Sequence, residues 1–185
     1  MQNIVLIPIG RTRQNVADFL SFSLPEILHA PCRLLEEEIA LEPFYSRDRQ
    51  QYHSTEILRK LLPYAVAAGQ HVLGIMDEDL YIPILTFVFG EAQLAGRCAL
   101  MSGHRLHQEY YGLPADESLY LHRCEKEAVH ELGHTLGLVH CSKPECVMQQ
   151  STYAEMIDLK QPEYCAECRQ QLDRYRRITL RTSTG

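Results

Sequence analysis

Short apolar runs set off by glycines recur along the first half of the chain and predict strands. Residues 3–9 (NIVLIPI) and 71–76 (HVLGIM) are almost wholly apolar, as expected for strands buried on both faces. Residues 32–41 alternate less cleanly, because three consecutive glutamates interrupt them. Two further runs, 85–89 and 93–101, adjoin or contain glycines, which favour bulges or the close approach of another backbone.

Longer stretches with apolar residues three and four apart predict helices. The clearest cover residues 15–28, with Pro25 as a candidate kink, and 46–68, which a glycine follows. A third helix is expected over 118–137 and a fourth over 169–177. Strands that alternate with helices and are followed by more strands indicate an α/β fold with a mixed sheet.

The length of 185 residues fits a single domain with a hydrophobic core of its own. We expect one domain over 1–185. Within it, an N-terminal α/β part (about 1–137) precedes a smaller C-terminal part (about 138–185) that holds four of the seven cysteines.

Charge and hydropathy narrow the class of protein. The formal net charge is -6 and no basic block is present, so nucleic acid is not an expected partner. No apolar stretch is long enough to cross a bilayer. We expect no secretory signal, because no positively charged residue precedes the first apolar run. We therefore expect a cytoplasmic protein, in which clustered cysteines are more often metal ligands than disulfides.

The sequence HELGHTLGLVH carries the clearest chemical signal. Residues four apart on a helix point the same way, so His130 and His134 are placed to bind one metal ion. Glu131 is turned away by about 100°, which suits contact with a water molecule on the ion better than coordination. Gly137 allows the positive φ that ends a helix, and the turn brings His140 back as the third ligand.

Three neutral imidazoles leave the fourth position of a tetrahedral zinc ion open, which is typical of a catalytic site. The ion lowers the pKa of a bound water toward about 7 and polarises a substrate carbonyl. Glu131 is then the expected general base, which takes the proton from the water and passes it to the departing amine. The pattern predicts zinc-dependent hydrolysis of peptide bonds.

Four cysteines form two close pairs: Cys141 and Cys146, then Cys165 and Cys168. Two such pairs predict a closed tetrathiolate zinc site, which would be the second zinc of the chain. The alternative is a redox pair at Cys165 and Cys168, in front of the last helix. That alternative leaves the first pair without a role, and no strand–CxxC–helix unit is evident. The other cysteines are expected to be small buried hydrophobes: Cys32, Cys98 and Cys124.

The zinc motif and the cysteines together resemble the archaemetzincins, a family in the metzincin clan of zinc metallopeptidases. The shared signature is the histidine motif, then Cys141-x4-Cys146-x-Met148, then Cys165-x2-Cys168. The spacer over 149–164 departs from the family pattern by at most a residue.

The resemblance implies the compact metzincin α/β fold, with a twisted mixed sheet and an active-site helix. It implies that Met148 lies in a tight turn beneath the zinc. It also implies an antiparallel edge strand, within 85–101, that lines the cleft and binds a peptide substrate by strand addition.

The first interpretation is a zinc metallopeptidase that acts on peptides, with aminopeptidase action as one option. The alternatives are an amidase on a small non-peptide substrate and a catalytically silent zinc-binding interaction domain. Glu131 argues against the silent domain, because a pure metal site does not need this carboxylate.

Overall fold

A five-stranded mixed sheet forms the centre of the protein. The computed structural model describes residues 1, 3–12 and 14–182, with side chains up to residue 175. The strands lie in the order β2-β1-β5-β8-β7, with the first four parallel and β7 antiparallel at the edge. Their bounds are Asn3–Pro8 (β1), Cys32–Leu34 (β2), Gln70–Met76 (β5), Gly90–Ala92 (β7) and Cys98–Ser102 (β8).

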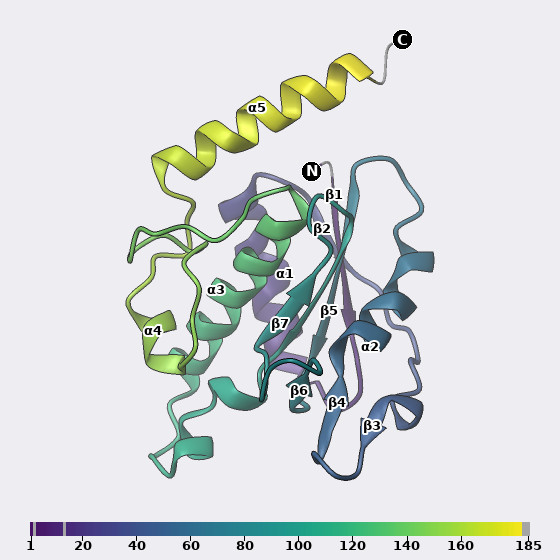
Figure 1. Ribbon diagram of the computed structural model, residues 1–185, viewed down its shortest axis with the longest axis vertical. Helices are drawn as coiled ribbons and strands as arrows, with labels where there is room; N and C mark the ends of the chain where they lie inside the picture. Colours follow the sequence, from purple (N-terminus) through teal and green to yellow (C-terminus); the bar gives the residue numbers. More distant parts are fainter. Residues whose placement is uncertain (2, 13, 183–185) are drawn as a thin grey trace.

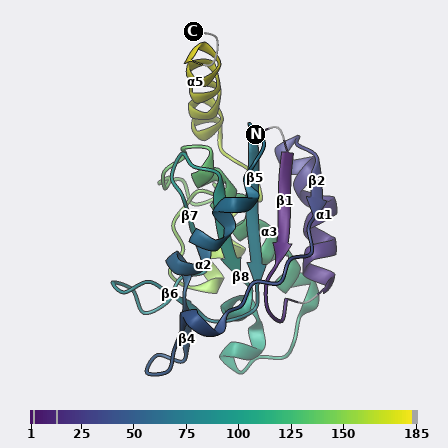
Figure 2. The same ribbon diagram turned by 90° about the vertical axis from the view of Figure 1, so that its right-hand side faces the viewer.

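Helices cover both faces of this sheet (Figures 1 and 2). α1 (Gln14–Leu28) and α3 (Glu117–Thr135) pack against one face, and α2 (Ser54–Leu61) packs against the other. The side chains of β1 alternate between the two hydrophobic cores, and β5 is buried along its whole length. The predicted α/β fold, with a mixed sheet, an active-site helix and an antiparallel edge strand, is confirmed. Pro25 lies inside α1 without ending it.

A small second sheet lies beyond the carboxyl ends of β1 and β5 (Figure 1). β3 (Tyr45–Ser46) and β4 (Gln51–His53) pair antiparallel, and β4 pairs with β6 (Leu80–Tyr81). The prediction of one helix over 46–68 is therefore wrong, since α2 covers only part of it. Gln50 takes a φ of 54° in the turn between β3 and β4, which a helix cannot accommodate.

Two predicted strands are shorter or absent. The second strand of the sheet ends at Leu34, and the glutamate-rich segment after it pairs with no strand. The apolar run 85–89 is a loop in which only Val88 forms an isolated bridge, with Leu80. Its apolar residues line a surface cleft, a use that hydropathy alone does not distinguish from a buried strand.

The C-terminal region packs against α3. α4 (Ala154–Asp158) is held there by Arg123, whose guanidinium donates two hydrogen bonds of 2.8 and 2.7 Å to the Asp158 carboxylate. α5 (Ala166–Thr182) is longer than the predicted 169–177 and projects from the body of the molecule (Figures 1 and 2). Within the described residues, no helix combines the length and the apolar character that crossing a membrane requires.

Candidate active site and metal centres

The end of α3 sets the course of the chain through the histidine motif. The Leu138 N–H donates to the Gly133 carbonyl (3.1 Å), and the Gly137 N–H donates to the His134 carbonyl (2.9 Å). This pair of bonds, with a φ of 87° at Gly137, is a Schellman ending. The turn carries the chain back to His140, as the glycine in the motif predicts.

The structure brings His130, His134 and His140 together, with one ring nitrogen of each within 4.8 Å of the others. His130 Nδ1 lies 2.7 Å from the Val147 carbonyl oxygen, and His134 Nδ1 lies 2.8 Å from that of Leu138. Because a carbonyl only accepts, both Nδ1 atoms carry the proton in the neutral rings, and both Nε2 atoms present a lone pair. These two Nε2 atoms lie 3.1 Å apart, an arrangement that a cation bound by both would satisfy.

Burial favours the neutral form of these histidines. It lowers the pKa of His130 well below the ordinary value, and the positive charge of Lys160 adds to the effect. Burial also lowers the pKa of His134 and of His140. The neutral imidazole is the form that binds a metal ion, so the site is prepared for one near neutral pH.

Glu131 lies beside the cluster, beneath the edge strand. Burial raises the pKa of its carboxyl well above the ordinary value, and the nearby Glu127 and Glu91 raise it further, whereas Lys160 lowers it. A Cβ atom added to Gly90 in β7 would lie 2.7 Å from Glu131 Cγ. Only glycine fits at this point of the strand, so the close approach of β7 confines the Glu131 carboxylate.

Met148 packs against the same stretch of α3 from the other side. Its side chain is fully buried, and a Cβ atom added to Gly133 would lie 2.4 Å from Met148 Sδ. The Met148 carbonyl accepts a hydrogen bond of 2.9 Å from the Cys141 N–H, next to His140 in the chain. Met148 therefore contacts both the middle of the histidine motif and the residue that follows His140.

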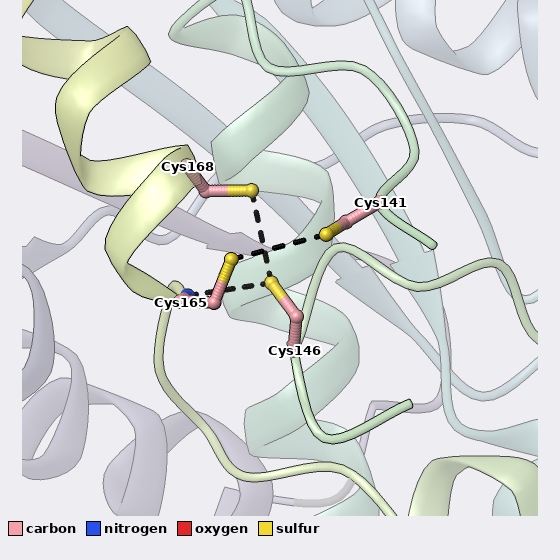
Figure 3. A group of neighbouring side chains, drawn as sticks. All are labelled: Cys141, Cys146, Cys165 and Cys168. Carbon is pink, nitrogen blue, oxygen red and sulfur yellow. Dashed lines mark hydrogen bonds between the residues drawn. The ribbon is translucent and has the colours of Figure 1, made fainter. Parts of the chain in front are cut away.

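The four clustered cysteines converge on one point between the loop after the histidine motif and the first turn of α5 (Figure 3). Cys141 Sγ lies 3.8 Å from Cys165 Sγ, and Cys146 Sγ lies 3.7 Å from Cys168 Sγ. Tetrahedral zinc with Zn–S bonds of about 2.3 Å places its sulfur ligands about 3.8 Å apart. The donor set and its spacing therefore fit a zinc ion.

The pKa of the Cys165 thiol is lowered from its ordinary value. Burial acts to raise its pKa, but hydrogen bonds from Cys168, Cys146 and Glu167 outweigh burial and lower the pKa to about 7. The thiolate is the form that binds metal. Of the remaining cysteines, Cys98 and Cys124 are buried, as predicted, whereas Cys32 is half-buried against the core.

A cleft of about 650 Å³ opens over the histidine cluster. One wall is β7 with the loop 82–89, and the opposite wall is the segment 150–153 after the methionine turn. Four large apolar side chains that line the cleft are exposed: Leu85, Leu94, Val139 and Tyr153. Ile82, at one end of the loop, also lines the cleft and is partly buried. Such a lining suits the apolar and backbone surface of a peptide.

A buried ion pair that the sequence does not predict lies at the floor of the cleft. Lys160 is 1% exposed, and its Nζ lies 3.6 Å from Glu127 Oε1. Neither of these two atoms has a hydrogen-bond partner among the described residues. Glu127 precedes Glu131 by four residues on α3, a spacing that indicates one shared helix face. No local pattern marks Lys160.

Comparisons with known proteins agree with this geometry. The model of peptidase family M54 matches residues 64–174. The archaemetzincin of Methanocaldococcus jannaschii is 37% identical over 172 residues, which cover 93% of each chain. The crystal structure of the Archaeoglobus fulgidus archaemetzincin, complexed with malonate, matches with a TM-score of 0.77 and 37% identity, covering 90% of this chain and 98% of that one.

A second solved structure is also similar in fold. The zinc-dependent peptidase from Methanocorpusculum labreanum matches with a TM-score of 0.82 and 30% identity, covering 92% of this chain and all of that one. The cleft, the histidine cluster and the cysteine cluster all lie within the residues that the family model matches, 64–174. The chain therefore belongs to the archaemetzincins, peptidase family M54, a family of zinc metallopeptidases.

Proposed function

We propose that His130, His134 and His140 hold a zinc ion and that Glu131 is the general base for hydrolysis of a peptide bond. The observation that carries the proposal is the pair of facing Nε2 lone pairs, 3.1 Å apart, with both Nδ1 protons held by carbonyl oxygens. Zinc bound at these nitrogens supplies a Lewis acid that polarises the substrate carbonyl and acidifies the attacking water.

In this proposal the residues of the chain divide the remaining work. The Glu131 carboxylate accepts the proton of the attacking water and delivers it to the nitrogen of the departing amine. The Val147 carbonyl holds the His130 ring in the tautomer that leaves its Nε2 free for the ion. Glu127 and Lys160 set the charge beneath Glu131, since the carboxylate raises its pKa and the ammonium lowers it.

We further propose that the peptide lies along β7 as an added antiparallel or parallel strand. β7 is the last strand of its sheet and lines the cleft next to Glu131. Backbone hydrogen bonds to such an edge give affinity that does not depend on side-chain identity. The apolar side chains on both walls would then contact the side chains of the peptide.

Cleavage at an amino terminus is the more specific form of this activity. Three carboxylates line the cleft, Glu91, Glu127 and Glu131, and the ammonium group of Lys160 lies beneath them, 3.6 Å from Glu127. In this form of the activity, a carboxylate of the cleft binds the ammonium group of the free amino terminus. Peptides with free amino termini should therefore be cleaved faster than their N-acetylated forms, in a comparison of kcat/KM on matched pairs. Equal values for both forms would favour internal cleavage.

Substitution of the proposed base tests the mechanism. Glu131→Gln keeps the size of the side chain and removes its basicity, so turnover should fall by about 10²–10⁴ while zinc content stays unchanged. Glu38→Gln, at an exposed glutamate far along the chain, is the matched control. Full turnover in Glu131→Gln would show that another group takes the proton, and loss of zinc would make Glu131 a structural residue.

Elemental analysis tests the metal content. With three histidines and four cysteines each gathered within 4.8 Å, we expect two zinc ions per chain in protein purified without chelator. His134→Ala should lower the count by one, and Cys168→Ser should also lower it by one. A single zinc, together with a disulfide between Cys165 and Cys168, would support the redox pair instead.

A further inference from the structure

A second hollow, of about 600 Å³, opens at the carboxyl ends of the parallel strands. Arg11 follows β1, Glu78 and Asp79 follow β5, and Arg105 follows β8; all four line this hollow. The small sheet supplies the other side, including Tyr52 and Arg49. We call it the switch-point pocket. It shares no lining residue with the zinc cleft.

The topology of the sheet makes the switch-point pocket a candidate ligand site. From β1 the chain passes through α1, on one face, to β2 on one side of β1. It then passes through α2, on the other face, to β5 on the opposite side of β1. The connections therefore diverge between β1 and β5. In open α/β sheets, the crevice outside the carboxyl ends at such a point is where ligands bind.

The charges of the switch-point pocket favour an anion. Three guanidinium groups, of Arg11, Arg49 and Arg105, face two carboxylates, of Glu78 and Asp79. Arg105 is already paired with Asp79 through bonds of 2.6 and 2.7 Å. The Arg11 side chain is exposed and makes no hydrogen bond or ion pair with any residue that the structure describes.

Neighbouring groups add donors to this positive surface. Burial raises the pKa of Tyr52, and the negative charge of Glu78 raises it further, so its hydroxyl keeps its proton. Arg49 uses its Nε and Nη2 in bonds to protein oxygens, which leaves Nη1 available. A planar guanidinium fork matches the oxygens of a phosphate or a carboxylate group.

The switch-point pocket is connected to the zinc cleft by the loop 82–89. Arg49 Nη2 donates to the carbonyls of Leu85 (2.7 Å) and Thr86 (3.2 Å). The Arg105 guanidinium lies 4.2 Å from the centre of the Phe87 ring. These three loop residues line the zinc cleft on their other side. An anion bound to Arg49 Nη1 would pull the guanidinium toward itself, lengthen the Nη2 bonds to the loop carbonyls and so loosen one wall of the cleft.

We propose that the switch-point pocket binds a small ligand through an oxyanion group, and that the bound ligand weakens peptide binding in the zinc cleft by engaging Arg49. The anion site lies outside the active centre, and its existence does not depend on the activity. The coupling to peptide binding rests on the proposed peptidase function. Coupling between two sites is reciprocal in binding free energy, so a bound peptide would weaken anion binding by the same factor.

Calorimetric titration of the zinc-loaded protein in an anion-poor buffer tests the site. The probes are inorganic phosphate and succinate, which distinguish a phosphate ligand from a carboxylate ligand. At least one should bind once per chain, and Arg11→Gln should weaken that binding about tenfold or more, the loss expected for a charge-assisted hydrogen bond. Arg33→Gln, at an exposed arginine of β2, is the control and should leave it unchanged.

Any phosphate bound at the catalytic zinc would be unaffected by Arg11→Gln, so the variant separates the two sites. The site is refuted if neither anion binds or if the Arg11→Gln variant binds the anion as tightly as the parent.

The coupling is tested by the KM of a cleaved peptide, which should rise several-fold with saturating anion in the parent and stay constant in Arg11→Gln. An unchanged KM in the parent would overturn the coupling, whereas absence of any peptide cleavage would count against the proposed function alone, since the titration needs no turnover.

Discussion

Gly133, in the middle of the histidine motif, shows how closely single residues are fitted around the site. It lies inside α3, where alanine would ordinarily stabilise the helix by about 0.5–1 kcal/mol. Here a Cβ atom would lie 2.4 Å from Met148 Sδ and 3.0 Å from Tyr164 Cε1. The Tyr164 hydroxyl is itself held by the Val129 carbonyl at 2.9 Å, so it cannot move away freely. The steric cost of the added methyl group therefore exceeds the gain in helix stability that alanine would ordinarily give.

We expect Gly133→Ala to lower the free energy of unfolding by about 1–3 kcal/mol, the usual cost of overpacking a core. Chemical denaturation at equilibrium measures it. The double variant Gly133→Ala with Met148→Ala provides the control, because removal of the thioether gives the new methyl group room. It should be less unstable than the sum of the two single variants. Additive losses would mean that Gly133 and Met148 do not compete for space.

At this scale the sequence predicts some contacts well and others not at all. His130 and His134 are four apart on a helix, so their convergence follows from helical geometry, and Gly137 accounts for the return of His140. The pairing of Lys160 with Glu127 joins two segments that no periodicity relates. Such a contact depends on how the C-terminal region packs, which a single sequence does not encode in local form.

Among the elements, strands with a continuous apolar run and helices with a clear period match their predicted bounds almost to the residue, and elements of mixed character do not. β5 and α1 follow their apolar patterns closely. The region 46–68 has helical spacing, yet its first part pairs as β3 and β4, because long-range hydrogen bonds to β6 replace the local ones. Tertiary pairing overrides propensity in short segments, where the helix would gain few bonds of its own.

The edge strand β7 is the element whose position most directly affects Glu131. Its Glu91 carboxylate accepts hydrogen bonds from the Ser54 and Thr55 hydroxyls at the start of α2, which holds the strand in place. The strand therefore cannot shift to admit a side chain at Gly90. A Cβ atom there would meet the Leu100 carbonyl oxygen at 2.6 Å as well as Glu131.

We therefore predict that Gly90→Ala lowers turnover at least about tenfold with both metals retained, since a misplaced general base loses part of its catalytic factor. Steady-state kinetics and elemental analysis on one preparation measure the two properties. Gly112→Asn is the control, because an added Cβ there meets no atom within 4 Å and asparagine tolerates the positive φ. Parent-like turnover in Gly90→Ala would show that β7 does not position Glu131.

For the molecule as a whole, the histidine cluster and the cysteine cluster are joined through very short stretches of chain. Cys141 follows His140 directly, and Cys146 precedes Val147, whose carbonyl orients the His130 ring. The Val147 N–H in turn donates to the Glu163 carbonyl at 3.1 Å, which ties the same segment to the region before α5. Zinc bound by the cysteine cluster would thus hold together the part of the chain that completes the histidine cluster.

This connection predicts which metal site matters more for stability. The proposed zinc ligands His130 and His134 already share one helix, so a zinc ion bound there would constrain little additional chain. The cysteine cluster links Cys141 to Cys165 across a loop, and a closed site of this kind contributes folding free energy directly, on the order of 10 kcal/mol in small zinc peptides and less within a larger core. Cys165→Ser should therefore lower the thermal midpoint by about 5 °C or more, and by more than His140→Ala does.

Differential scanning calorimetry of the two variants, both loaded with zinc, decides the order. Cys32→Ser is the matched control, since Cys32 is half-buried and belongs to neither metal cluster. Cys165→Ser should also reduce turnover although it is not at the catalytic centre, because release of Cys141 and Cys146 frees His140 and Val147 beside them. His140→Ala should abolish turnover with a smaller change in midpoint. If His140→Ala proved the more unstable variant, the histidine site and not the cysteine site would be the main metal contribution to the fold.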